Sequence, residues 1–150
     1  MSVFHTMYLG SNCDFSNLKK SLTDFASVKD FKTVDTHDKI TVCSEGLTMF
    51  IKEGGNGVTF RSEDYGLMFK FEFYIDINSS YPNWAVELME FVGNILKNFN
   101  GDFILEANGD LPYIMRKKED GIVIVDDSKL GVFPFKSLGI AYKKEKLERV

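Results

Sequence analysis

The stretch from Pro82 to Val125 constrains the fold most, because a long amphipathic segment leads into three short apolar runs separated by turn residues. Apolar side chains recur there at spacings of three and four, which predicts a helix of about 16 residues with one buried face. Pro82 suits the start of this helix, and Gly101 suits the left-handed position just past its end. The apolar positions are Trp84, Leu88, Phe91, Val92, Ile95, Leu96 and Phe99.

The segment after this helix predicts an antiparallel meander. Asn108-Gly109 and Asp120-Gly121 are typical of tight turns between paired strands. Pro112 cannot donate a hydrogen bond to a neighbouring strand, so regular pairing of the second strand is expected only from Tyr113 onward. The three expected strands cover residues 103–107, 113–116 and 122–125.

The first 53 residues predict a strand, a helix and a hairpin. Val3–Leu9 is apolar and β-prone, whereas Phe15 to Phe25 follow helical spacing in a segment expected to end near Val28. Lys29–Lys39 is highly charged and predicts a surface connection with a short extended piece. Beyond it, alternating residues from Ile40 to Ile51 predict two strands joined at Glu45-Gly46.

Glycines at positions 54, 55 and 57 predict another chain reversal before Val58 and Phe60, with no helix beginning there, and a polar loop is expected at Ser62–Asp64. Leu67–Ile77 then alternates between apolar and mixed residues, which predicts a long central strand. At the other end of the chain, the charged segment Tyr142–Val150 predicts a frayed terminal helix.

These elements predict one α+β domain spanning residues 1–150. We expect a mainly antiparallel sheet of roughly six to eight strands, with two principal helices packed on one face. Core residues should come from the long helix and the central strand. The expected core residues are Trp84, Leu88, Phe91, Ile95, Phe71 and Phe73.

Composition excludes several classes of protein. The longest apolar runs fall far short of a membrane-spanning helix, and the N-terminus lacks the basic and apolar regions of a secretory signal, so a cytoplasmic protein without a membrane partner is expected. A net charge of −4 disfavours nucleic-acid binding but permits a basic partner. Cys13 and Cys43 have no Cys-x-x-Cys spacing, so free thiols are expected.

Motifs for catalysis and for cofactors are missing from the sequence. The densest group of potential ligands, Asp35-Thr36-His37-Asp38, is more typical of a solvated loop than of a metal site, and no phosphate-binding loop follows the glycines at 54–57. We therefore expect neither a metal nor a cofactor. A hydrolase would require Cys43 to meet His5 or His37 in space, and this alternative stays open.

The same C-terminal stretch carries a family resemblance. Its features are a helix leading into Gly101-Asp102, strand residues Phe103 to Leu105, the Asn108-Gly109 turn, Arg116, and Gly121 before Ile122 to Val125. In these features the chain resembles the Sit-type immunity proteins of bacterial polymorphic toxin systems. The resemblance covers about 40 residues, a length sufficient for one helix and a meander.

The resemblance implies a non-catalytic cytoplasmic protein that binds one toxin domain and blocks it, as a monomer or weak homodimer. A basic nuclease is one class of toxin that the acidic charge would suit. Acidic loop residues and tyrosines outside the expected core are the candidate contacts. These candidates are Glu63, Asp64, Tyr65, Tyr81, Tyr113, Asp126 and Asp127. A homo-oligomeric adaptor or structural protein is the non-enzymatic alternative.

Overall fold

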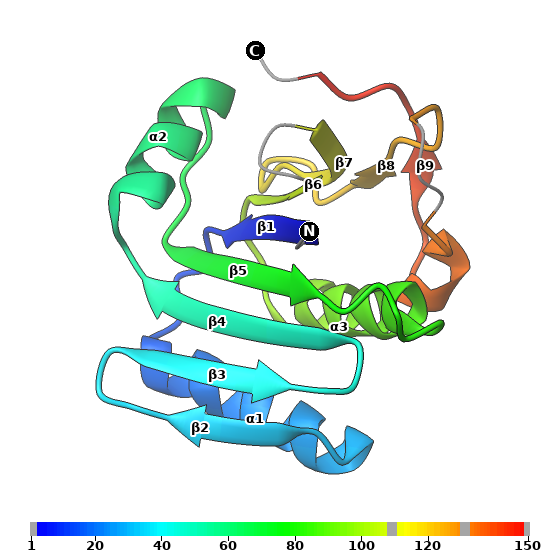
Figure 1. Ribbon diagram of the computed structural model, residues 1–150. Helices are drawn as coiled ribbons and strands as arrows, with labels where there is room; N and C mark the ends of the chain where they lie inside the picture. Colours follow the sequence, from blue (N-terminus) through cyan, green and yellow to red (C-terminus); the bar gives the residue numbers. More distant parts are fainter. Residues whose placement is uncertain (1–2, 108–110, 130–132, 149–150) are drawn as a thin grey trace.

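The computed structural model describes residues 3–107, 111–129 and 133–148 of the chain, and within them it shows an α+β fold (Figure 1). The elements are β1 (Val3–Leu9), α1 (Phe15–Lys29), β2 (Lys32–Asp35), β3 (Lys39–Cys43), β4 (Leu47–Glu53), α2 (Asn56–Tyr65), β5 (Phe71–Ile77), α3 (Trp84–Asn98), β6 (Phe103–Ala107), β7 (Leu111–Arg116), β8 (Val123–Val125), the 3₁₀ helix η1 (Phe135–Leu138) and β9 (Lys143–Lys144).

The strands form one nine-stranded sheet in the order β2-β3-β4-β5-β1-β6-β7-β8-β9. Neighbouring strands are antiparallel, except for the parallel pair β8 and β9. The expectation of a mainly antiparallel sheet is therefore confirmed. The described strands exceed the predicted six to eight because β2 and β9 are short edge strands, which alternation in the sequence reveals poorly.

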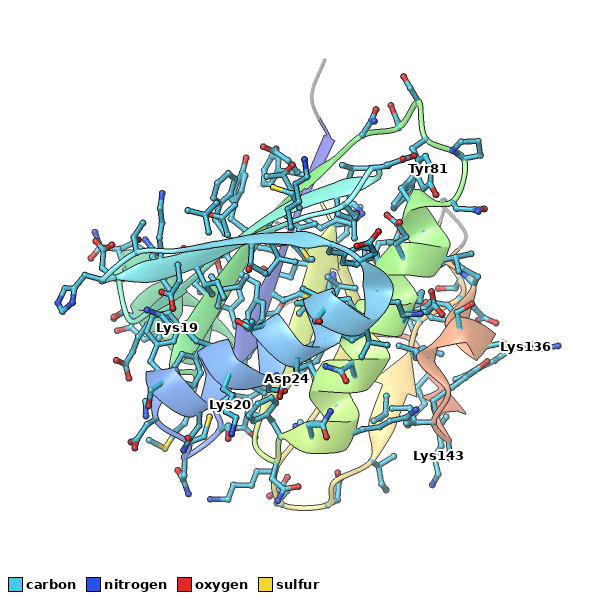
Figure 2. The ribbon with its side chains drawn as sticks, turned by 90° about the horizontal axis from the view of Figure 1, so that it is seen from below. Lys19, Lys20, Asp24, Tyr81, Lys136 and Lys143 are labelled. Carbon is cyan, nitrogen blue, oxygen red and sulfur yellow. The ribbon has the colours of Figure 1, made fainter. Side chains whose placement is uncertain are left out.

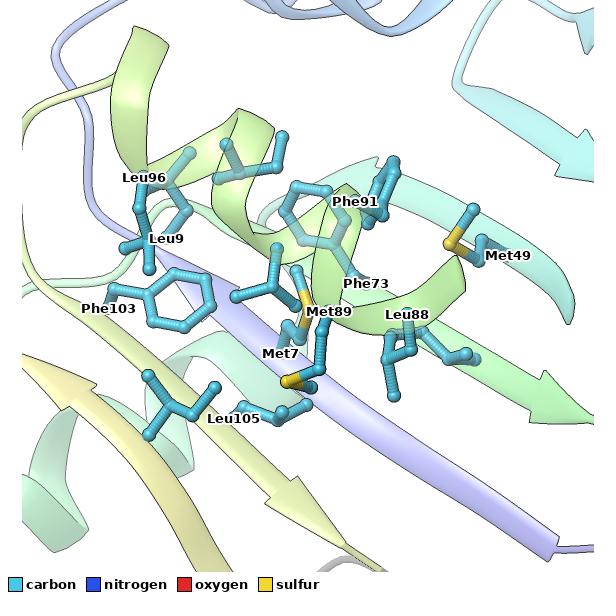
Figure 3. Close-up of a cluster of buried hydrophobic side chains, with 14 of the residues drawn as sticks. Met7, Leu9, Met49, Phe73, Leu88, Met89, Phe91, Leu96, Phe103 and Leu105 are labelled. Carbon is cyan, nitrogen blue, oxygen red and sulfur yellow. The ribbon is translucent and has the colours of Figure 1, made fainter. Parts of the chain in front are cut away.

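Helices α1 and α3 pack on one face of the sheet, as predicted, and close the main core. Buried side chains of α3, including Phe91 and Leu88, lie over Met7 of β1 and Phe73 of β5 (Figure 3). All of the expected core residues except Trp84 are buried. Trp84 is half-buried at the start of α3, where it packs against the edge of this core.

The predictions that no helix begins after the glycines at 54–57 and that Ser62–Asp64 is a loop are wrong, because Asn56–Tyr65 forms helix α2. This helix packs on the opposite face of the sheet, where Val58 and Tyr65 contact Tyr8, Ile104 and Met115. The glycines before it still reverse the chain, since both Gly54 and Gly55 have positive φ. As a result α2 covers the part of this second face formed by β1, β6 and β7, and its first turn also meets β5 at Glu72.

Other segments also differ from the predictions, at the start of β5 and at the C-terminus. β5 begins at Phe71 instead of Leu67. Before it, the backbone N–H of Phe69 donates a hydrogen bond to Ser62 Oγ of α2 and not to a neighbouring strand. The C-terminal segment contains β9 and no helix within its described residues. The Asn108-Gly109 turn lies outside the described residues, although β6 and β7 pair as that prediction requires.

The strand pairing is irregular near Pro112 as predicted, but β7 already begins at Leu111, and its regular pairing starts one residue later than the predicted Tyr113. Leu105 pairs with Ile114, but the next residue, Glu106, pairs with Pro112, so the register shifts at this point. Tyr113 is the extra residue of this bulge, and regular pairing begins at Ile114. The Asp120-Gly121 turn also forms as expected, with Gly121 at a φ of 66°.

Candidate functional site: the open face of the sheet

The face of β2 to β5 that points away from α1 and α3 is free of helices among the described residues except at Glu72, where α2 begins, and we call it the open face (Figure 1). Strand register arranges its side chains in cross-strand rows. In the central row Val34, Thr41, Phe50 and Tyr74 lie on consecutive strands. Directly opposite residues on one face of a sheet lie within side-chain contact. The central row is therefore a continuous strip that runs from the free edge of β2 to the middle of the sheet.

Aromatic rings dominate this strip. Phe4 of β1 stacks on Tyr74 with ring centroids 5.3 Å apart, and Phe50 lies 6.4 Å from Tyr74. Tyr74 is 37% exposed despite its position in a central strand. We call Phe4, Phe50 and Tyr74 the aromatic cluster. Large apolar groups gathered on an accessible surface typically mark a binding site, so the cluster is the leading candidate for one.

An open groove of about 470 Å³ lies beside the aromatic cluster. The Lys39 ammonium lies 5.4 Å from the Phe50 ring centroid at one side of the groove. Lys52 pairs with Glu72 across 3.5 Å, and Glu72 also accepts a hydrogen bond from Tyr8 Oη. The lining residues are Lys39, Phe50, Ile51, Lys52, Glu72 and Tyr74. The groove thus combines an apolar floor with a charged margin.

Two charges flank the aromatic cluster without an ion-pair partner among the described residues. Lys39 lies in the row that contains Lys52 and Glu72, and Asp76 lies in the row on the other side of the central one. Alternate residues along a strand share a face and are about 6.8 Å apart. Lys39 and Asp76 therefore place opposite charges on opposite sides of the cluster.

The half of this face under α2 is occupied by a buried polar network. Glu106 is fully buried and accepts hydrogen bonds of 2.6 Å from both Arg61 Nε and Tyr65 Oη. Burial and the neighbouring Glu72 carboxylate raise the pKa of Tyr8 to about 12. These contacts fix α2 to β6. They also stabilise the Glu106 carboxylate, because a buried charge is stable only when it is paired and hydrogen-bonded.

The predicted contact residues divide into buried and accessible groups. Tyr65 and Tyr113 are 9% and 3% exposed and belong to the core, and Asp126 is 1% exposed, so their prediction as surface contacts is wrong. Tyr65 donates to Glu106, whereas burial and the nearby Asp126 raise the pKa of Tyr113. Each of these polar side chains is stabilised by partners inside the fold.

Asp126 holds the C-terminal segment in place. Its carboxylate accepts hydrogen bonds from Leu147 N–H at 2.8 Å and from the hydroxyl of Ser128 at 2.5 Å, and it pairs with Lys129. Burial alone would raise the pKa of Asp126, but these hydrogen bonds outweigh burial and hold it well below its usual value of 3.8. The carboxylate is a structural group that ties residues after β9 to the end of β8.

The other predicted contact residues are accessible but come from three separate segments. Glu63 is exposed on α2, and the adjacent Asp64 is half-buried and pairs with Arg61 at 3.3 Å. Tyr81 is half-buried in the connection between β5 and α3 (Figure 2). Asp127 is exposed after β8 and pairs with Lys144. No hydrogen bond or ion pair joins these segments through the four residues within the described part of the chain.

The Asp35-Thr36-His37-Asp38 loop holds an ammonium group. Lys19 Nζ of α1 donates to Asp35 Oδ1 at 2.8 Å and to the carbonyl oxygens of Thr36 and His37 at 2.9 and 3.4 Å. Among the described residues, no group of three or more His, Cys, Asp or Glu side chains is arranged to hold a metal ion. The loop is therefore anchored to α1 by a lysine.

The structure does not bring Cys43 together with either histidine. Cys43 pairs in register with Thr48 on the open face, whereas His5 points to the other face and packs against Trp84 and Phe133. His37 precedes β3, and Cys43 ends that strand, about 13 Å beyond Lys39 at the usual rise of about 3.3 Å per residue. A thiol nucleophile paired with a histidine base is not formed by these residues.

Burial of His5 predicts a loss of stability in mild acid. Its Nδ1 donates to Phe4 O at 2.7 Å, and Nε2 has no partner among the described residues. Burial lowers the pKa of His5 from 6.5, although the bond to Phe4 opposes this. Below pH 6.5 the unfolded chain therefore binds a proton at His5 that the folded chain does not. The free energy of unfolding consequently decreases as the pH is lowered.

Urea unfolding at pH 7.5 and pH 5.5 measures this effect. His5→Phe should reduce the difference in unfolding free energy between the two pH values, because a phenylalanine ring binds no proton in the folded or the unfolded chain. His37→Gln alters the other histidine, which lies exposed in the β2–β3 turn, and is the matched control. An equal pH difference in wild type and His5→Phe would contradict the prediction.

Residues of the family resemblance build the fold. Gly101 has a φ of 115°, and a Cβ there would lie 2.6 Å from Gly10 O. Asp102 accepts hydrogen bonds from the backbone N–H groups of Met68 and Lys118, and buried Arg116 donates to Leu96, Phe99 and Gly101. All of these contacts are internal to the chain. Gly101, Asp102 and Arg116 are therefore structural residues, and they do not mark a contact surface.

The aromatic cluster was not among the residues that the sequence indicated as contacts. A signal was present in the mixed face of the predicted strand Leu67–Ile77, where Tyr74 stands among charged residues. Phe4 and Phe50, however, reach this site only through the pairing of β1 and β4 with β5.

No described helix is long and apolar enough to cross a membrane. Comparisons with protein-family models, with curated proteins and with solved structures find no match to this chain.

Proposed function

We propose that this chain is an immunity protein that binds a cognate bacterial toxin domain and neutralises it without catalysis. The observation that carries the proposal is the aromatic cluster on the open face, because accessible tyrosine and phenylalanine beside charged residues are typical of protein interfaces. The resemblance between residues 82 and 125 adds the class of partner. Under this proposal the protein acts in the cytoplasm and needs no cofactor.

Charge supports a basic toxin, such as a nuclease. The whole chain has a net charge of −4, and the excess of acidic groups lies outside the open face, whose own charged side chains are Lys32, Lys39, Lys52, Glu72 and Asp76. Acidic surfaces attract basic partners over several ångströms and speed their association, and added salt weakens this effect. Exposed Glu63, together with Asp64, would contribute to this attraction without needing to lie in the contact.

Co-expression with the product of the neighbouring reading frame tests the proposal. That product should be toxic when expressed alone, this chain should relieve the toxicity, and the two should be purified as a one-to-one complex. Stoichiometric binding predicts that protection follows the relative amounts of the two proteins, whereas a catalyst would protect at far lower amounts. A harmless neighbour that is not captured by this chain would contradict the proposal.

A homo-oligomeric adaptor is the second candidate, and the free edge of β2 favours it. All four residues of this strand are exposed, and β3 is its only partner in the described sheet. An unpaired edge can add a strand from a second copy. Native mass spectrometry of the purified chain separates the candidates: a stable dimer without added partner supports the adaptor, and a monomer that gains mass only with the neighbouring protein supports the inhibitor.

A further inference from the structure

We infer that the toxin contacts the open face, with a basic group against Asp76, an apolar centre over the aromatic cluster and a carboxylate against Lys39. This inference rests on the proposed function and specifies the surface that performs it. The occupant is a folded protein domain, because the aromatic cluster and its flanking rows extend over β3, β4, β5 and β1.

The open face is accessible apolar surface in an otherwise covered sheet. Helices α1 and α3 close one face, and α2 closes the β1, β6 and β7 part of the other together with the Glu72 end of β5. In the central row, Val34 is 59% exposed and Tyr74 is 37% exposed. Apolar side chains left in water at the centre of a surface patch gain most from burial by a partner.

The groove beside the aromatic cluster can receive an anchoring side chain of the partner. It offers about 470 Å³ beside Phe50 and Tyr74, with the backbone and side chains of β4 and β5 beneath it. A space of this size accepts one or two large side chains, and interface anchors of this kind pair aromatic or aliphatic groups with a preformed pocket. The stacked Phe4 ring holds Tyr74 from the β1 side, so the wall is preorganised.

The charges that flank the aromatic cluster specify the orientation of the partner. Lys52 and Glu72 already neutralise one another, so Lys39 and Asp76 are the charges beside the cluster that lack ion-pair partners among the described residues. Asp76 adjoins Tyr74 on the same strand face, where a guanidinium could stack on the ring and pair with the carboxylate. Opposite charges on opposite sides admit one orientation of a partner and repel the reverse.

Charge-reversal and aromatic variants test the inference against the neighbouring protein, purified from the co-expressed complex. Tyr74→Lys should weaken binding by roughly 30-fold or more, because it removes a central anchor. Asp76→Lys and Lys39→Glu should each weaken binding by about tenfold. Both charged residues are on the surface, so these two variants remain informative if Tyr74→Lys does not fold.

Matched controls carry similar changes outside the open face. Phe60→Lys replaces an aromatic residue that is 57% exposed on α2, and Lys20→Glu reverses a charge on α1, which covers the opposite face (Figure 2). Both controls should bind within about threefold of wild type, as expected for residues outside an interface. Urea unfolding of every variant verifies that the proteins compared are folded.

The outcomes separate this inference from the proposed function. Weak binding by the open-face variants and normal binding by both controls would support it. If wild type relieves toxicity and the open-face variants bind equally well, the surface is wrong and the function stands. Loss of binding by Tyr74→Lys with normal binding by both charge reversals overturns the proposed orientation. If wild type neither protects nor captures the neighbouring protein, the function is wrong and the inference falls with it.

Discussion

Replacing Phe91 by alanine should lower the free energy of unfolding by about 3–5 kcal/mol, the usual cost of emptying a fully buried phenylalanine site. Phe91 is 0% exposed and lies where α1, α3 and the sheet meet. Its ring is 5.6 Å from Phe25 of α1 and 6.1 Å from Phe73 of β5, and both contacts are edge-to-face. Its removal therefore weakens contacts among three elements and leaves a cavity that rigid neighbours fill only in part.

Urea unfolding followed by tryptophan fluorescence measures the change, since Trp84 at the start of the same helix is the chain's one tryptophan. Phe60→Ala is the control: it removes the same side chain from an exposed site on α2, where a loss within about 0.5 kcal/mol is expected. A loss below about 1 kcal/mol for Phe91→Ala, with an unchanged denaturant slope, would contradict the packing of α3 described here.

How far sequence predicts this fold depends on whether one type of residue occupies a regular spacing. In α3 the apolar residues are uninterrupted at helical spacing, and this helix was predicted within a few residues of its bounds. In α2 the positions facing the sheet are Val58, Arg61 and Tyr65. The polar Arg61 interrupts the apolar pattern because its partner is the buried Glu106. A helix that packs through an ion pair has no apolar period to detect.

The candidate contact residues show a second limit of sequence. Tyr65, Tyr113 and Asp126 have side chains that are common on surfaces, and their burial depends on partners far away in the chain. Tyr65 meets Glu106 across 41 residues, and Asp126 meets Leu147 across 21. Only the folded chain supplies these hydrogen bonds, which make burial of a polar group tolerable. The aromatic cluster shows the converse, because pairing of distant strands leaves Phe50 and Tyr74 accessible.

The proposed binding surface and the family resemblance therefore lie in different parts of the fold. Gly101, Asp102 and Arg116 organise the junction between α3 and β6, whereas the aromatic cluster lies on β1, β4 and β5. This separation makes framework variants and contact variants distinguishable: the first should alter stability, and the second should alter binding.

Arg116 offers the sharpest test of the framework, and Arg116→Met should lower the free energy of unfolding by about 3–5 kcal/mol, because three buried carbonyl groups each lose a charged hydrogen-bond donor. Arg116 is 6% exposed and donates to Leu96 O, Phe99 O and Gly101 O at 2.9, 2.8 and 2.9 Å. These carbonyls belong to the end of α3 and the turn after it, where helical partners run out.

The charge of Arg116 contributes as well as its hydrogen bonds. Burial lowers the pKa of Arg116 and the Asp102 carboxylate opposes this, but the guanidinium remains a cation at any pH at which the protein folds. A cation at a helix C-terminus interacts favourably with the helix dipole. Methionine keeps much of the side-chain length but supplies no donor, so it leaves three buried carbonyl groups without the partner they have in wild type.

Two further variants separate geometry from charge in the same urea measurement. Arg116→Lys keeps the charge, but one ammonium cannot reproduce a planar fork that reaches three acceptors, so an intermediate loss is expected. Lys97→Met removes an exposed cation from the last turn of α3 and should cost less than about 1 kcal/mol. Equal losses for Arg116→Met and Lys97→Met would assign the effect to the helix dipole and contradict a structural role for the buried fork. A large loss confined to position 116 would identify the α3–β6 junction as the point on which the framework depends.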